Sequence, residues 1–213
     1  MAKLNIFFLL LFFFHNNHLP AAQSKPASGP NQEPLDFIKA ECRATRYPAL
    51  CVQCLSNYSA TIQQSQRQLA RAALSVSLAW ARSAAAFVSR LARIEGMRPT
   101  EHAAVKDCVE NMGDTVAQLC RSVKELGSMG RGPGQEFEWC VSNVQTWVSA
   151  ALTDEDTCLD GVSGSGLDGS VKGKIRRRVV GCARVTSNAL ALVNRFAAKH
   201  KAGGSMSGIN GMP

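Results

Sequence analysis

The sequence predicts an all-α protein, an up-down-up-down four-helix bundle preceded by a short disulfide-stapled helical hairpin. Three observations favour this fold. Apolar and small residues recur in alternating steps of four and three in four long segments, which places each set on one face of a helix. Segments rich in Gly and Pro separate the four sets. No segment shows the alternation of apolar and polar residues that is typical of a strand.

The first residues are typical of a secretory signal peptide. One Lys precedes an apolar run at 6–14, and small residues that suit cleavage follow. This run is too short to span a bilayer, and we expect no later segment to cross one. We therefore expect a signal peptide at 1–23, a linker rich in Pro, Ser and Gly at 24–35, one folded domain at 36–200 and a disordered tail at 201–213.

The hairpin is expected at 36–59. Two short helical pieces flank residues 43–48, and Cys42 and Cys51 lie on either side of this bend. In an oxidising compartment the eight cysteines form a disulfide framework before they act as reactive thiols. A bond between Cys42 and Cys51 would therefore staple the hairpin. Asn57 opens the only N-glycosylation sequon of the chain.

The bundle is expected at 65–200. Glycines and prolines at 96–99, 127–134 and 161–169 mark its connections, and Thr100 with the acid that follows it is typical of a helix start. The four predicted core stripes are Leu69, Ala73, Val76, Trp80, Ser83, Phe87 and Ile94; Val105, Val109, Met112, Val116, Leu119, Val123 and Leu126; Phe137, Val141, Val144, Val148 and Ala151; and Ile175, Val179, Cys182, Thr186, Ala189, Val193 and Phe196.

The formal net charge is +8, and much of the positive charge lies at 172–178 and at 199–201. A secreted basic protein meets acidic polysaccharide or an acidic surface more often than nucleic acid. No aromatic residues interleave with these bases along the chain, which argues against a nucleic-acid platform. A solvated helix face that serves solubility alone explains the same charge equally well.

Four segments together resemble one known family. They are AECRATRYPALC at 40–51, AVKDCVENMGDTVAQL at 104–119, VQTWVSAALTDEDTCLDG at 144–161 and VTSNALALVNRF at 185–196. In this order they resemble the plant invertase and pectin methylesterase inhibitors, and the third segment closely resembles the pectin methylesterase inhibitor branch. The resemblance covers about 36–200. It implies the same fold, a four-helix bundle preceded by a helical hairpin.

The resemblance also implies the disulfides. They are Cys42–Cys51 in the hairpin and Cys108–Cys158 between the second and third bundle helices. It implies a free thiol at Cys182. Because Cys182 lies on an apolar stripe, we expect this thiol to be buried and inert. Three cysteines depart from the family pattern: Cys54, Cys120 and Cys140. With Cys108 joined to Cys158, Cys120 and Cys140 lie about 9 Å apart along the helices, so they can bond only if the third helix is interrupted or the helix pair tilts.

The resemblance implies a partner and a contact face. In the pectin methylesterase inhibitors one face of the bundle covers the substrate cleft of the enzyme. The matching residues are Glu110, Asp114, Thr157 and Asp160, while a further family acid falls at Ala117, which has no charge. The resemblance thus implies a secreted protein of the apoplast and cell wall that forms a stoichiometric complex and restrains pectin de-esterification. A solvated face without a partner is the competing interpretation.

Two further interpretations concern the partner. Acid invertase is the alternative target, although the branch that inhibits it often carries Pro-Lys-Phe where this chain has Gln135-Glu136-Phe137, which reverses a charge. The pro-region of a full pectin methylesterase is disfavoured, because the sequence ends at 213 without a catalytic domain. The basic C-terminal helix suggests weak binding of acidic pectin, and we expect neither a nucleic-acid nor a membrane partner.

We expect no enzymatic activity, cofactor or metal. Only His102 and His200 remain after signal removal, and the loop sequence GVSGSG at 161–166 does not match the G-x-S-x-G motif. Cys51-x-x-Cys54 suggests a redox or zinc pair, but no second pair or histidine set accompanies it. A disulfide from Cys51 to Cys42, with Cys54 left over, is the favoured interpretation.

Overall fold

The computed structural model describes residues 32–130 and 134–207, and within these ranges it contains helices and no strand. The elements are α2 (Gln32–Cys42), α3 (Pro48–Leu55), the 3₁₀ turn η1 (Ser56–Tyr58), α4 (Ser59–Ile62), α5 (Gln66–Leu91), α6 (Pro99–Ser128), α7 (Gln135–Gly164) and α8 (Gly169–Ser207). The all-α prediction is confirmed. Two predicted boundaries differ from the structure: α2 includes the end of the linker at 24–35, and α8 extends into the tail at 201–213. The signal peptide predicted at 1–23 lies outside the described residues.

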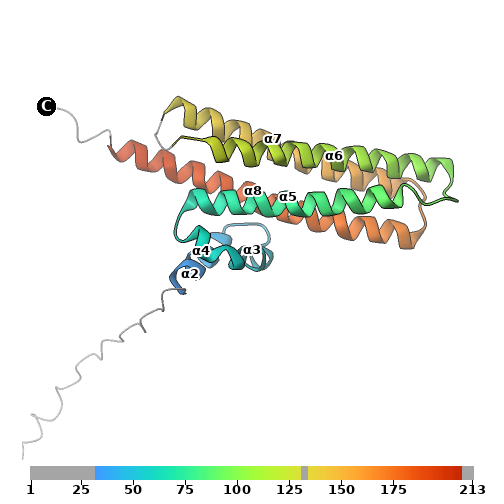
Figure 1. Cartoon of the computed structure of the whole chain (residues 1–213), viewed down its shortest axis with the longest axis horizontal. Coiled ribbons are helices and arrows are strands. Elements are labelled where there is room, and N and C mark those ends of the chain that lie inside the picture. Colours follow the sequence, from blue (N-terminus) through green and yellow to red (C-terminus); the bar gives the residue numbers. More distant parts are fainter. Residues whose placement is uncertain (1–31, 131–133, 208–213) are drawn as a thin grey trace, which may run out of the picture.

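The four long helices form one bundle in which each packs on its neighbours in the chain and α5 also packs on α8. The α6–α7 pair lies on one side and the α5–α8 pair on the other, as Figure 1 shows. The hairpin of α2 and α3 packs beside α5 and α8. The bundle therefore has two outer faces that belong to different helix pairs.

The core stripes predicted for α7 and α8 are buried throughout, but the stripe predicted for α5 is wrong in its second half. Trp80 is 40 % exposed and Ile94 is 52 % exposed, whereas Ser77, Ala81 and Ala84 are buried. At 100° per residue Trp80 lies within about 20° of Leu69, so the predicted stripe runs straight along the helix. The buried face is centred instead on Ser77, Ala81 and Ala84, about 60–120° further round α5, so the stripe follows its edge.

In α6 the buried face is rotated slightly from the predicted one. Thr115 and Ser122 are fully buried, while Val116 and Val123 are only partly buried. The two hydroxyls donate hydrogen bonds to backbone carbonyls one turn earlier, 3.0 Å from the oxygens of Asn111 and Gln118 respectively. These bonds satisfy the hydroxyls without water, so polar residues can line this helix contact.

By length and composition, α5 could cross a membrane, contrary to the expectation that no later segment could. Its apolar residues, however, face the other helices. The buried residues of α5 are Leu69, Ala70, Ala73, Leu74, Val76, Ser77, Leu78, Ala81, Ala84 and Val88. Burial along one face against α6 and α8 is typical of a core helix of a bundle.

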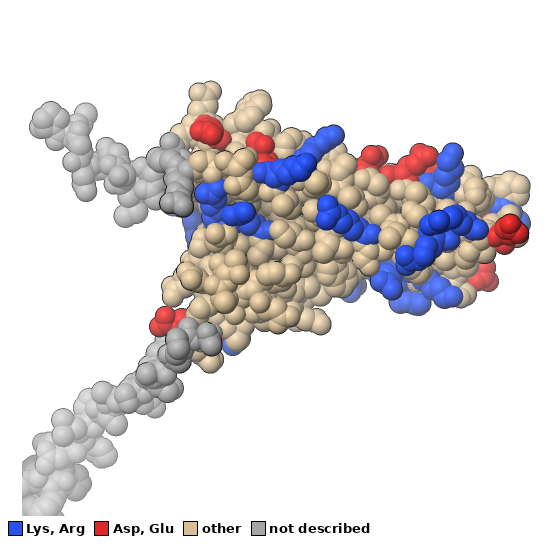
Figure 2. All heavy atoms as spheres, viewed as in Figure 1, with Lys and Arg blue, Asp and Glu red and all other residues tan. Residues whose placement is uncertain are grey.

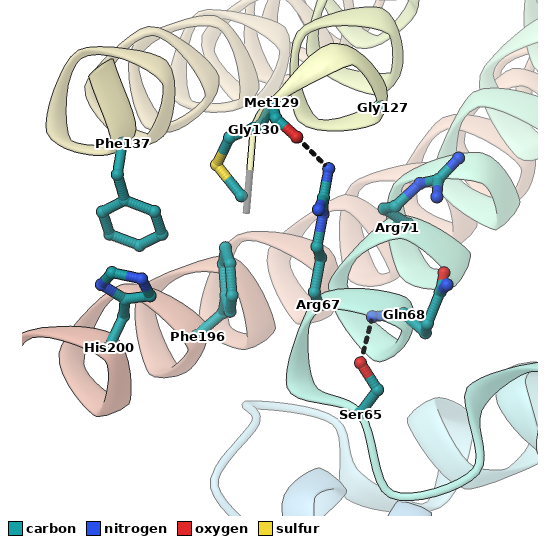
Figure 3. Close-up of a pocket in the computed structure, with 10 residues that line it drawn as sticks. All are labelled: Ser65, Arg67, Gln68, Arg71, Gly127, Met129, Gly130, Phe137, Phe196 and His200. Atoms are coloured by element: carbon teal, nitrogen blue, oxygen red, sulfur yellow. Dashed lines mark hydrogen bonds between the residues drawn. The ribbon is translucent and has the colours of Figure 1, made fainter. Parts of the chain in front are cut away.

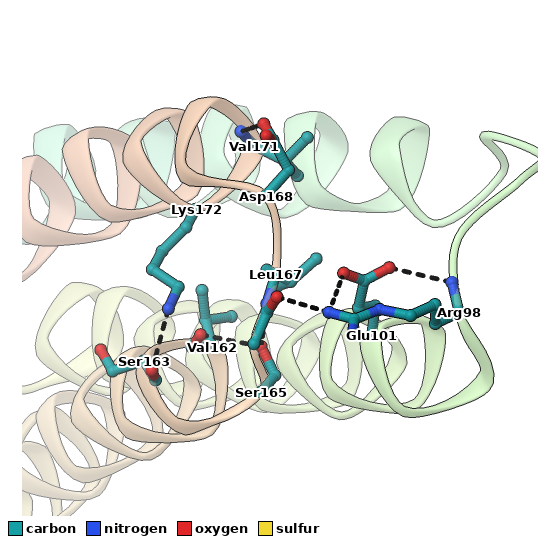
Figure 4. Close-up of polar contacts among 10 residues, drawn as sticks. Arg98, Glu101, Val162, Ser163, Ser165, Leu167, Asp168, Val171 and Lys172 are labelled. Carbon is teal, nitrogen blue, oxygen red and sulfur yellow. Dashed lines mark hydrogen bonds and ion pairs between the residues drawn. The ribbon is translucent and has the colours of Figure 1, made fainter.

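The end of the bundle that joins α5 to α6 and α7 to α8 is held by polar contacts (Figure 4). The N-cap of α6 is Arg98, two residues before the helix start predicted at Thr100. The Arg98 guanidinium donates to Glu101 Oε1 and to the Gly166 carbonyl, each at 2.7 Å. Asp168 caps α8, since its Oδ1 accepts the backbone N–H of Ser170 at 2.8 Å. Arg98 thereby ties the two connections together.

The hairpin is stapled by the predicted Cys42–Cys51 disulfide and is fastened to α8. Asn188 accepts the Tyr47 N–H at 3.0 Å and donates to the Tyr47 carbonyl at 2.9 Å. Glu41 forms ion pairs at 2.7 Å with two bases of α8, Arg195 and Lys199. Although burial raises the pKa of Glu41, these cations outweigh it and lower the pKa below its ordinary value. The hairpin is thus a fixed part of the domain.

Candidate partner-binding face

The predicted Cys108–Cys158 disulfide joins α6 to α7, and the structure shows that it is buried. Thr115 Oγ1 lies 3.4 Å from the Ala151 carbonyl, and the Asn143 amide donates to Glu125 Oε1 at 3.2 Å. These contacts follow an antiparallel register that extends from the disulfide along both helices. The disulfide therefore fixes the relative position of the two helices along most of their length.

The same register explains the state of the extra cysteines. Cys120 is twelve residues after Cys108, so it lies opposite Thr146, about six residues or about 9 Å along the helix from Cys140. The two thiols are free, and Cys140 instead lies 3.5 Å from the Glu125 carbonyl. The helix α7 is continuous here, so neither condition for a Cys120–Cys140 bond is met.

The four residues predicted at the contact face, Glu110, Asp114, Thr157 and Asp160, are all exposed on α6 and α7. Glu110 and Asp114 are one turn apart on α6, opposite its buried face. In the register set by the disulfide, all four fall within about 12 Å along the helix axes. The structure thus places the four exposed residues at similar heights along the α6–α7 pair, near the buried disulfide.

The carboxylates of this face have few partners of their own. Among the residues that the structure describes, neither Glu110, Asp114 nor Asp160 forms an ion pair or a side-chain hydrogen bond with another residue. Thr157 donates its hydroxyl to the Thr153 carbonyl at 2.8 Å. The α7 helix contains no Lys or Arg that could neutralise the face. The carboxylates are therefore free to accept hydrogen bonds from another molecule.

Asp154 is a member of this region that the sequence analysis did not single out. It is half-buried on α7, and its Oδ2 atom is buried without a hydrogen-bond partner. Burial, together with the nearby charge of Asp114, raises the pKa of Asp154 above its ordinary value. Asp114 and Asp154 therefore repel each other across the α6–α7 seam when both are ionised. A cation placed there by a partner would relieve this repulsion.

The neighbouring acid, Glu155, lies in the core of the bundle and is fully buried. It accepts a hydrogen bond at 2.9 Å from Thr186 of α8, which lies 2.9 Å from the hydroxyl of Ser77 on α5. Burial raises the pKa of Glu155 to about 7, and the hydrogen bonds from Cys182 and Thr186 offset this rise only in part. Glu155 therefore belongs to the packing of the bundle and lies away from the outer face.

Other predicted residues lie elsewhere in the fold. Asn57 is exposed in η1, where a sugar chain would meet no core residue. Gln135 and Glu136 are exposed at the start of α7, while Phe137 is buried. Because Cys51 is bonded to Cys42, the thiol of Cys54 has no partner in a Cys-x-x-Cys redox or zinc pair.

The end of the bundle opposite Arg98 contains a cavity of about 560 Å³. Figure 3 shows Phe137 beside His200 and Phe196 on one side, and Arg67 directed at the backbone of the α6–α7 connection on the other. The Phe137 and His200 rings stack with centroids 3.6 Å apart. The Arg67 guanidinium donates to the carbonyl of Met129, so it joins the start of α5 to the residues that follow α6.

Comparison with known proteins agrees with this architecture. A family model described as plant invertase/pectin methylesterase inhibitor matches residues 36–192. Two solved structures of pectin methylesterase inhibitors from Arabidopsis share the fold, with TM-scores of 0.59 and 0.53 at 21 % identity. They are matched over 95 % and 96 % of their own chains, and over 74 % and 76 % of this one.

Relatives with higher identity cover most of the chain. Pectinesterase inhibitor 9 of Arabidopsis thaliana is 49 % identical over 83 % of this chain and 88 % of its own. Pectinesterase inhibitor 11 of the same plant is 43 % identical over 94 % of this chain and 100 % of its own. A 21 kDa protein of Daucus carota is 48 % identical over 86 % and 91 %. On these matches, the chain belongs to the plant invertase/pectin methylesterase inhibitor family.

Proposed function

We propose that this protein is a secreted inhibitor of pectin methylesterase that covers the substrate cleft of the enzyme in a stoichiometric complex. Relatives that are 43 % and 49 % identical over most of its length are named pectinesterase inhibitors. The protein itself performs no chemistry in this proposal. By excluding substrate, it restrains de-esterification of pectin in the cell wall, where the signal peptide expected at 1–23 would deliver it.

One observation carries the proposal: exposed carboxylates without partners lie on a surface that a buried disulfide holds in place. A rigid surface loses little conformational entropy on docking, so its contacts contribute more fully to affinity. Basic groups around an enzyme cleft would pair with Glu110, Asp114 and Asp160, and would relieve the repulsion between Asp114 and Asp154. Thr157 adds a hydroxyl acceptor to the same surface.

The test is a double charge reversal, Glu110→Lys with Asp114→Lys. Both residues are exposed, so the stability of the inhibitor should change by only about 0.5 kcal/mol. Placing two cations opposite basic groups costs several kcal/mol at an interface, so the inhibition constant should rise by orders of magnitude. The measurements are the inhibition constant and the helical circular dichroism of the same preparation.

The matched control is Arg176→Glu with Arg177→Glu, which reverses two exposed charges on α8, outside the α6–α7 face. We expect this variant to inhibit nearly as well as the parent. If the Glu110 and Asp114 variant keeps its helix content and inhibits like the parent, the contact face is elsewhere. The two variants change the net charge in opposite directions, so equal loss of inhibition in both would mean that the α6–α7 face has no special part in binding and that the proposed face is wrong.

Acid invertase remains the alternative target, and a parallel titration decides between the two. We propose that invertase stays active, because Gln135 and Glu136 replace the Pro-Lys of the other branch and Phe137 is buried against the His200 ring. Inhibition of invertase at an equal or lower concentration would move the protein to that branch. Glycosylation at Asn57 and weak binding of acidic pectin by the basic α8 are further proposals, and the second has a definite structural candidate.

A further inference from the structure

Each of α5, α7 and α8 carries charges of one sign only, whereas α6 carries both. Neither α5 nor α8 contains an acidic residue, whereas α7 contains no Lys or Arg. In the view of Figure 2, Lys and Arg gather toward the end of the bundle where α5 ends and α8 begins. This basic face lies on the side of the bundle away from the α6–α7 pair. An anionic partner bound there would leave the proposed enzyme-binding face open.

The basic face contains a groove of about 380 Å³ between α5 and α8. Trp80 and Ser83 of α5 line one side, and Arg177 and Arg178 of α8 line the other. The Trp80 ring lies across Gly181, where even a methyl group would come within 3.0 Å of it. Gly181 therefore lets α8 carry the indole as a flat platform that stays 40 % exposed.

The two arginines of the groove are exposed and available. Arg178 lies over the Phe87 ring, with its guanidinium carbon 5.2 Å from the ring centroid, a contact that orients the guanidinium while leaving its N–H groups to bind. In the described part of the chain, neither Arg177 nor Arg178 forms an ion pair. Both cations therefore offer planar donor sets that match a carboxylate.

The fold supplies what the sequence of α8 lacks. No aromatic residue interleaves with the bases along the chain, yet α5 places Trp80 and Phe87 beside the arginines of α8. An aromatic platform next to guanidinium groups suits a saturated ring that presents C–H groups on one face and carries a carboxylate at its edge. A sugar acid in a polymer has this form.

We propose that the groove of Trp80, Arg177 and Arg178 binds a de-esterified stretch of a uronic acid polysaccharide. The choice of this polymer rests on the proposed function, because removing methyl esters from pectin leaves carboxylates of this kind. A methyl ester has no charge for the arginines, so the groove prefers the product of the esterase to its substrate. The inhibitor would thus stay on the pectin regions that the enzyme has already processed.

The test titrates the full mature protein, with its disulfides intact, with unesterified oligogalacturonides at about 0.15 M salt, where long-range attraction is screened. Arg177→Gln with Arg178→Gln should weaken binding about tenfold or more, and Trp80→Ala at least about fivefold, since a lost charge-assisted bond or stacked ring is typically worth such factors. Fully methyl-esterified oligomers should bind at least about tenfold more weakly to the parent. The matched control, Arg121→Gln with Lys124→Gln on α6, should stay within about twofold.

Three results would overturn the proposal. The first is equal weakening by the groove variant and the α6 control. The second is equal affinity of the parent for esterified and unesterified oligomers. The third is equally tight binding of single-stranded DNA or phosphatidylglycerol vesicles, which would make the face a general anion surface. If Trp80→Ala loses helical circular dichroism, the arginine variant gives the result alone, because its side chains are exposed.

This test is independent of the proposed function. Direct binding to a purified pectin methylesterase, measured by calorimetry without pectin, should be unchanged in both groove variants. Loss of oligogalacturonide binding with intact esterase binding supports the groove. If the parent protein binds unesterified oligogalacturonides preferentially but binds no esterase, the groove proposal is supported and the inhibitor proposal is refuted.

Discussion

Glu155→Gln should abolish most of a pH dependence that the buried carboxyl imposes on stability. Glu155 is fully buried on α7 and its pKa is raised from 4.5 to about 7, chiefly by burial. In the unfolded chain the carboxyl ionises near its ordinary value, while in the folded protein it holds its proton up to about pH 7. Folding therefore binds a proton between these two values.

The two pKa values of Glu155 determine the direction and the magnitude of this pH dependence of stability. The stabilisation is full below about pH 4.5, falls as pH rises toward 7 and stays lost above that value. A difference of about 2.5 pKa units corresponds to about 3 kcal/mol of unfolding free energy. The Gln variant cannot ionise and keeps a carbonyl that can accept from Thr186. Its stability relative to the parent should therefore increase by about 3 kcal/mol from pH 4 to pH 8.

The assay is urea unfolding with disulfides intact, followed by circular dichroism at several pH values from 4 to 8. The quantity to plot is the difference in unfolding free energy between variant and parent, because other titrating groups cancel in it. Glu138→Gln, an exposed acid on the same helix, is the matched control and should show no such trend. A difference for Glu155→Gln that does not change with pH would refute the reasoning, whatever its absolute value.

Two further predictions concern the cysteines. Replacing Cys108 and Cys158 by Ser should lower the unfolding free energy by about 4 kcal/mol, against about 3 kcal/mol for Cys42 and Cys51, because the loops closed are 50 and 9 residues long; urea midpoints in the wrong order would contradict this. In the native protein, alkylation followed by peptide mass spectrometry should label the half-buried Cys54 and Cys120 faster than the buried Cys140 and Cys182. Burial raises the pKa of Cys54, Cys140 and Cys182, that of Cys140 to about 11, so the exposure of each thiol decides the order. Resistance of Cys120 together with Cys140 would indicate the bond that the register forbids.

The sequence predicted the bundle well where large apolar residues carry the burial. In α7 and α8 the valines, Ile175 and Phe196 mark the core face directly. In α5 small residues carry it: Ala81 and Ala84 are buried while Trp80 is exposed. Size and hydrophobicity therefore misled the prediction at a helix contact where close approach matters more than apolar volume. Alanine can be buried or exposed at equally low cost, so its position alone does not identify a face.

The candidate site was predicted in part. The exposure of Glu110 and Asp114 followed from their spacing against the stripe of α6, since helical periodicity determines which residues point outward. The groove at Trp80 could not be predicted, because it combines residues of α5 and α8 that are about a hundred positions apart in the sequence. No local pattern of bases and aromatics reports such a pairing.

The acidic run at 154–156 shows how one sequence feature divides into three roles. Successive residues of a helix point about 100° apart, so the three acids cannot share an environment. Asp154 lies at the seam with Asp114, Glu155 lies in the core beside Thr186, and Asp156 is exposed. The acidic run at 154–156 therefore occupies a seam, a core and a surface position in immediate succession.

The spacing contained a signal for the buried acid. Continuing the predicted α7 stripe past Ala151 by the same steps of four and three reaches Glu155 and then Cys158, and both are fully buried. A carboxyl at that position destabilises the fold most when it is ionised. The contribution of Glu155 to the unfolding free energy is therefore most favourable at low pH, where it is protonated. Because Glu155 lies on the helix that carries Thr157 and Asp160, the stability of the element behind the proposed contact face depends on the protonation of Glu155.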